Sequence, residues 1–171
     1  MSRIHVCPLS DLEATLATSG ARRMISLMGP GKATARPEQV DNGFLAMEFH
    51  DIGEPRDGLS PPTREHMVEL LGFLADWDQR TDLLIHCWMG ISRSTAAAAI
   101  ALAQRDPNGD MEALAQRLRA ASPMATPNPL MISLADELLQ LDGRLSKAIA
   151  GIGRGAEASQ GQPFVLEMRD G

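Results

Sequence analysis

The sequence has no tyrosine, and aromatic residues make up only 4% of its 171 positions. The core must therefore rest on Leu, Ile, Val, Met and Ala. No apolar run approaches the ~18–20 residues of a membrane-spanning helix, because the longest, residues 96–103, has eight. The first thirty residues mix acidic and basic side chains among short apolar stretches, which predicts a cytoplasmic protein without a signal peptide.

Cysteine and positive charge are also scarce. The two cysteines, Cys7 and Cys87, lie 80 positions apart, so a disulfide scaffold is excluded and both are expected to be free thiols. Lys and Arg number 16 against 22 Asp and Glu, a net charge of -6. This balance argues against nucleic-acid partners and against binding to a membrane surface. The histidines are scattered, so neither a metal nor a cofactor is expected.

Strand-like and helix-like segments alternate along the chain. Strands are predicted at residues 4–8, 23–28, 45–50 and 83–86, with helices near 10–20, 92–104, 110–118 and 128–149. A further helix ends near residue 77 and is expected to be capped by Ser60 or Thr63. This order predicts an α/β fold with a mostly parallel central sheet of four to five strands flanked by helices. Residues 1–150 are expected to form one domain. The Gly-, Ser- and Gln-rich residues 151–171 are expected to form a loosely ordered tail, although its residues 163–168 could dock somewhere on the protein.

Two helix ends carry more detailed expectations. Ser10 and Glu13 have the spacing of a capping box, which predicts that the first helix begins at this point. A stripe of apolar residues from Leu134 to Ile149 predicts one continuous last helix, opened by Asn128.

The junction after the strand at residues 83–86 concentrates reactive side chains, in the segment HCWMGISRS at residues 86–94. Cys87 stands where main-chain amides and the start of the next helix favour a thiolate. Gly90 allows the backbone to curl so that these amides converge. Arg93 can grip two phosphate oxygens with its planar fork, and the Ser94 hydroxyl can stabilise the thiolate. The segment is therefore expected to bind an anion next to a nucleophilic sulfur.

This segment matches the loop pattern His-Cys-x-x-Gly-x-x-Arg-Ser/Thr at all of its fixed positions. The sequence thereby resembles the protein tyrosine phosphatase superfamily of cysteine-dependent phosphatases. With its short length and no tyrosine to form a side wall for the substrate ring, it looks more like the compact dual-specificity type than the large tyrosine-specific branch. The resemblance implies that Cys87 attacks phosphorus while Arg93 holds the phosphate oxygens and His86 orients the loop. It also implies that substrate is bound by Trp88, Met89, Gly90, Ile91, Ser92 and Arg93.

The resemblance further implies a general-acid aspartate some thirty-odd residues before the cysteine. Asp51 lies 36 residues before Cys87 and Asp57 lies 30 before it. We favour Asp51, because a carboxylate at the end of a predicted strand is aimed more reproducibly than one in the middle of a loop. Asp57 remains the alternative.

The predicted function is a phosphomonoester hydrolase that acts through a phosphocysteine, on protein phosphotyrosine or with dual specificity. The expected partners are a phosphoprotein or small aryl phosphate and phosphate-like anions; no oligomeric state is predicted. The loop carries no Lys or Arg besides Arg93, which argues against a polyanionic head group. One alternative is a phosphate-binding module without turnover. Another is thiol redox or transfer chemistry, which requires Cys7 beside Cys87.

Overall fold

A five-stranded sheet in the order β3-β2-β4-β1-β5 forms the centre of the molecule, as the computed structural model of residues 2–168 shows. The strands are β1 (Arg3–Pro8), β2 (Arg23–Met28), β3 (Phe44–Glu48), β4 (Leu83–Cys87) and β5 (Phe164–Glu167). The first four are parallel to one another, and β5 runs antiparallel to β1. The mostly parallel α/β fold predicted from the sequence is confirmed.

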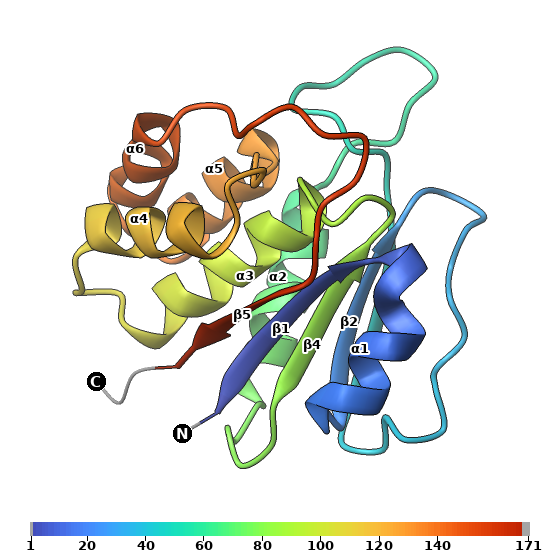
Figure 1. Ribbon diagram of the computed structural model, residues 1–171. Helices are drawn as coiled ribbons and strands as arrows, with labels where there is room; N and C mark the ends of the chain where they lie inside the picture. Colours follow the sequence, from blue (N-terminus) through green and yellow to red (C-terminus); the bar gives the residue numbers. More distant parts are fainter. Residues whose placement is uncertain (1, 169–171) are drawn as a thin grey trace.

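The helices cover the two faces of the sheet unequally (Figure 1). They are the 3-10 helix η1 (Leu9–Asp11), α1 (Leu12–Ser19), α2 (Arg64–Ala75), α3 (Arg93–Arg105), α4 (Met111–Ala121), α5 (Pro129–Leu138) and α6 (Arg144–Gly151). Helix α1 packs on one face, and the other α-helices form a thicker layer against the opposite face. Within residues 2–168 no helix is both long enough and apolar enough to cross a membrane.

The central strands explain why the reactive segment lies where it does. Strands β2 and β4 are buried along their whole length, as expected for strands covered on both faces. Helix α3 lies in the middle of the thicker layer, and its run of alanines, residues 96–99, is completely buried. Such small side chains let the helix axis approach its neighbours closely. Because β1, β3 and β4 are parallel, their carboxyl ends meet at one edge, where the loop after Cys87 begins.

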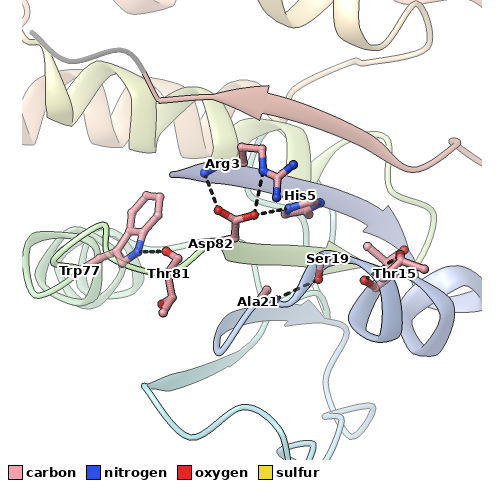
Figure 2. Close-up of polar contacts among 9 residues, drawn as sticks. Arg3, His5, Thr15, Ser19, Ala21, Trp77, Thr81 and Asp82 are labelled. Atoms are coloured by element: carbon pink, nitrogen blue, oxygen red, sulfur yellow. Dashed lines mark hydrogen bonds and ion pairs between the residues drawn. The ribbon is translucent and has the colours of Figure 1, made fainter. Parts of the chain in front are cut away.

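A polar cluster of Arg3, His5 and Asp82 lies at the other end of the parallel strands, where β1 and β4 begin (Figure 2). Asp82 accepts hydrogen bonds from the main-chain N and the Nε of Arg3, and its carboxylate meets His5 Nε2, each at 2.9 Å. In the same region Trp77 Nε1 donates to the carbonyl of Thr81 at 2.9 Å. These contacts hold β1 in register beside β4.

The Asp82 carboxylate is held in its charged form. Burial by itself raises its pKa, but the hydrogen bonds with His5 and Arg3 outweigh that effect and hold the pKa below its ordinary value. A carboxyl group with a lowered pKa in the folded state stabilises the protein above its unfolded pKa of about 3.9. That contribution is lost as the pH falls through the folded pKa.

We expect Asp82→Asn to lower the free energy of unfolding by about 1–2 kcal/mol at pH 7, because the charge-assisted hydrogen bonds are weakened. The difference from the wild type should shrink as the pH falls below about 4. Urea denaturation across this pH range measures both effects. Asp78→Asn is the matched control, since the Asp78 side chain is 51% exposed. A difference that stays constant from pH 7 to pH 3 would contradict the role given to the Asp82 charge.

Residues 163–168, for which docking was left open, include the strand β5, which pairs with β1. Phe164 and Leu166 are buried against the core, whereas Val165 faces solvent. Strand β5 pairs with β1 from Arg3 to Val6 and covers the free edge of that strand. An alternation of only four residues, preceded by Gly, Ser and Gln, is too short to indicate a strand against its background.

Two expectations about helix ends are wrong. The Ser10–Glu13 capping box does not form, because Ser10 donates instead to the Asp11 carboxylate at 3.0 Å. The predicted last helix is divided into α5 and α6. Its break is stabilised by Asp136, whose carboxylate accepts from the main-chain N of Gly143 at 2.7 Å and of Ser146 at 2.8 Å. The apolar stripe continues across the break because both helices face the same core.

Candidate active site

The sulfur of Cys87 lies at the bottom of the loop that joins β4 to α3. Cys87 is the last residue of β4 and is only 2% exposed. Its Sγ accepts from the main-chain N of Gly90 at 3.2 Å and lies 3.1 Å from Ser94 Oγ. A main-chain N–H and a hydroxyl group thus face the sulfur.

The curl of the loop depends on Gly90. Its φ is +68°, in the region that favours glycine. A Cβ at this position would lie 2.6 Å from the main-chain N of Pro8, a contact that the rigid β1 backbone cannot relieve. The loop therefore comes closer to β1 than any residue with a side chain would permit.

Arg93 stands at the first position of α3 with its side chain turned inward. It is 6% exposed, and its Nη1 donates to the carbonyl of Phe49 at 2.9 Å. Its Nε is buried and has no hydrogen-bond partner in residues 2–168. A buried N–H group without a partner is costly, and a phosphate oxygen would satisfy it. The side chain is thus fixed by the Phe49 carbonyl and lines the pocket described below.

Asp51 reaches the same loop from the far side. Its Oδ1 accepts from Ser92 Oγ at 2.6 Å and from Asn128 Nδ2 at 2.9 Å. The preceding residue, His50, is clamped to Ser60 by two hydrogen bonds, so the chain is fixed where it leaves β3. The other carboxylate oxygen, Oδ2, makes no hydrogen bond within the described part of the chain, which leaves it available to a ligand.

These side chains border one pocket of about 900 Å³. Its lining includes Asp51, Cys87, Trp88, Met89, Ile91, Ser92 and Arg93. Trp88 is 54% exposed and Met89 39% exposed, so both present apolar surface at the pocket. Farther walls come from Asn128, Pro129 and Ile132 around the start of α5, and from Ile149 and Arg154.

The remaining predicted residues lie behind the pocket or away from it. Gly90, His86 and Ser94 are buried and do not line it. Burial lowers the pKa of His86 to about 4, the charge of Arg93 acts in the same direction, and a contact with the Cys87 main chain offsets this only in part. A neutral His86 supplies no charge to the sulfur. Asp57 is exposed on the loop after Asp51 and does not line the pocket.

The two thiols belong to different sides of the sheet. Cys7 packs with Leu84 in the cluster beneath α1, whereas Cys87 belongs to the larger core under α3. Burial, above all, raises the pKa of Cys7 to about 11, so its thiol stays protonated and unreactive. The alternative of thiol redox or transfer chemistry requires a second thiol beside Cys87. Cys7 does not meet this requirement, because it lies in the cluster on the other face of the sheet.

Sequence reasoning missed several residues that build the site. Asn128 was assigned only to the start of a helix; its Oδ1 does cap α5, but its Nδ2 also holds Asp51. The Phe49 carbonyl, which fixes Arg93, has no signal in a sequence. Arg154 lies in the glycine-rich segment that was interpreted as a tail. Of these residues, only Asn128 has a signal in the sequence, its position at the start of a predicted helix.

Comparison with solved structures shows that this fold is shared with dual-specificity phosphatases. DUSP15 superposes with a TM-score of 0.61 at 18% identity, covering 86% of this chain and 90% of that one. Human DUSP28 gives 0.59 at 17% identity, covering 80% and 88%. The Yvh1 phosphatase domain from Chaetomium thermophilum gives 0.55 at 16% identity, covering 83% and 93%. No family model and no curated protein matches the sequence. The predicted resemblance to the compact dual-specificity type is therefore confirmed in the fold.

Proposed function

We propose that this protein hydrolyses phosphomonoesters through a phosphocysteine formed on Cys87, with phosphotyrosine of proteins as its substrate class. The observation that carries the proposal is the convergence of three groups on one pocket: a sulfur facing a main-chain N–H and a hydroxyl group, a buried guanidinium with an unpartnered Nε, and an anchored carboxylate. The fold shared with dual-specificity phosphatases agrees with it.

In the first step the Cys87 thiolate attacks phosphorus, forming an S–P bond as the P–O bond to the leaving group breaks. The Arg93 guanidinium and the main-chain N–H groups of the loop hold the other phosphate oxygens, where charge accumulates in the transition state. Asp51 gives its proton to the leaving oxygen, which departs as the neutral alcohol or phenol. Its anchored Oδ1 leaves Oδ2 as the oxygen that carries this proton.

In the second step water attacks the phosphocysteine. The Asp51 carboxylate takes a proton from that water, an O–P bond forms, and the S–P bond breaks to release inorganic phosphate and the thiolate. Ser94 Oγ, 3.1 Å from the sulfur, stabilises the thiolate as it leaves. The cycle ends with Asp51 protonated again, so no further reactant is needed.

The depth of the pocket supports an aryl phosphate over an alkyl one. Cys87 is almost completely buried, whereas Trp88 and Met89 are exposed beside it. A phosphate at the sulfur must therefore be carried on a long group, and a flat ring can pack against these two side chains. Phosphotyrosine meets both requirements.

We expect acid quenching during turnover of phenyl phosphate to trap a phosphate adduct on the peptide that contains Cys87. Mass spectrometry of the digested protein detects it, and the Cys7 peptide serves as the internal control. Hydrolysis without an adduct would overturn the covalent mechanism. Saturable binding of phenyl phosphate with neither adduct nor hydrolysis would favour the alternative, a phosphate-binding module.

A further inference from the structure

A second cation lines the pocket that contains Cys87 and Arg93. It is Arg154, on the segment of residues 152–163 that runs from α6 to β5 and is called here the C-terminal strap. In Figure 1 the strap crosses the top of the molecule, above α5, before descending to β5. The strap therefore forms one wall of the candidate active site.

The strap is held at two points, at the loop that joins β4 to α3 and at the connection between α4 and α5. Gly161 N donates to the carbonyl of Met89 at 2.8 Å, and a Cβ at Gly161 would lie 2.8 Å from the carbonyl oxygen of Gly90. Gly155 N donates to Thr126 Oγ1 at 3.1 Å, and a Cβ there would lie 2.5 Å from the main chain of Met124. Main-chain contacts this close fix the position from which Arg154 extends.

Further support comes from Arg119 on α4. Its guanidinium donates to the carbonyls of Ile152 and Gly153 at the start of the strap, and to those of Pro123 and Ala125 in the connection before α5. The backbone on the amino-terminal side of Arg154 is thereby joined to the pocket wall. The main chain on both sides of Arg154 is thus held in place by hydrogen bonds.

The charge of Arg154 is not neutralised by the protein. Within residues 2–168, neither Arg154 nor Arg93 forms an ion pair with a carboxylate, whereas Arg3, Arg22, Arg64 and Arg80 do. Two arginines without a carboxylate partner therefore border the same pocket. The pocket that Arg154 and Arg93 line also has apolar lining residues, among them Ile132, Ile149 and Ala150.

We propose that this pocket selects phosphomonoesters whose apolar or aromatic body carries a second anionic group, and that Arg154 binds that group. The inference rests on the proposed function, since it takes Arg93 to hold the phosphate. A pocket of about 900 Å³ is large enough for such a body, because ligand sites of this kind span roughly 300–1,000 Å³. The second anion can be a carboxylate of a small aryl phosphate or an acidic residue beside phosphotyrosine.

The test compares ester pairs that differ only in that charge. One pair is 4′-carboxybiphenyl-4-yl phosphate and its carboxamide; the other is a phosphotyrosyl peptide with Glu or Gln next to the phosphotyrosine. We expect the anionic member to have a kcat/KM higher by roughly tenfold in at least one pair, as for one charge-assisted hydrogen bond. Arg154→Gln should bring this ratio close to one, and Arg154→Lys should retain part of it. Arg80→Gln, in the turn before β4, is the matched control and should keep the wild-type ratio.

The outcomes separate the two proposals. If both members of each pair are hydrolysed equally by the wild type, or if Arg154→Gln leaves the ratio unchanged, the second-anion site is wrong while the phosphatase proposal stands. Dissociation constants of the same pairs with Cys87→Ser test the site without turnover, and equal constants would overturn it. A preference confined to the small esters or to the peptides identifies which source supplies the anion.

Discussion

Cys87→Ser is expected to lower hydrolysis of phenyl phosphate by about 10⁴-fold or more, since removing a covalent nucleophile has effects of this order. A serine hydroxyl is not ionised near neutral pH and has no base beside it, because Asp51 lies across the pocket and His86 is buried behind the loop. The oxygen is smaller than the sulfur and fits the same space. Phosphate should still bind, because Arg93 and the loop amides are unchanged. Steady-state hydrolysis and phosphate titration measure these two properties separately.

Cys7→Ser is the matched control for this variant. Cys7 is also a buried thiol on an adjacent strand, but it belongs to the cluster on the other face of the sheet. We expect this variant to retain turnover. Equal losses of hydrolysis in the two variants would indicate that both substitutions disturb folding. A loss of hydrolysis only in Cys7→Ser would favour the alternative of thiol redox chemistry. Retained hydrolysis in Cys87→Ser would refute the phosphocysteine.

The second large effect is expected from Asp51→Asn, which should slow esters with a poor leaving group, such as phenyl phosphate, by about 10²–10⁴-fold. An amide cannot supply the proton, whereas its oxygen can still accept from Ser92 and Asn128, so the loop should keep its geometry. With 4-nitrophenyl phosphate, whose leaving group needs little protonation, the loss should be much smaller. The dependence of the loss on the leaving group distinguishes proton donation from a structural effect.

Asp57→Asn provides the comparison for Asp51→Asn. Asp57 is exposed on the same loop and does not line the pocket, so its substitution should change neither ester noticeably. A loss dependent on the leaving group in Asp57→Asn, and none in Asp51→Asn, would transfer the general-acid role to Asp57.

The sheet and the reactive loop could be predicted because their signals are local. A buried strand that ends at Cys87, a glycine three residues later and an alanine-rich helix starting at Arg93 lie within one short stretch of chain. The signals are specific in combination, because their spacing along the chain agrees. The choice of Asp51 over Asp57 also used a local argument, the position at the end of a strand, and Asp51 is the one that borders the pocket.

The parts that could not be predicted depend on contacts between distant segments. Asn128 meets Asp51 across 77 positions, and strand β5 is stabilised by pairing with β1 rather than by its own alternation. The break between α5 and α6 is stabilised by the Asp136 carboxylate, which accepts hydrogen bonds from two main-chain N–H groups. Periodicity indicates which residues face the core, but it contains no information on such pairings.

The loop around Cys87 is gripped by an early and a late part of the polypeptide: Leu9 N donates to the carbonyl of Trp88 at 3.2 Å, and Gly161 N donates to that of Met89. On the ribosome, residue 161 is made well after Cys87 and Arg93. A nascent chain therefore has the sulfur and the guanidinium before it has the hydrogen bond from Gly161 that holds their loop. A chain released before Gly161 is made lacks that brace.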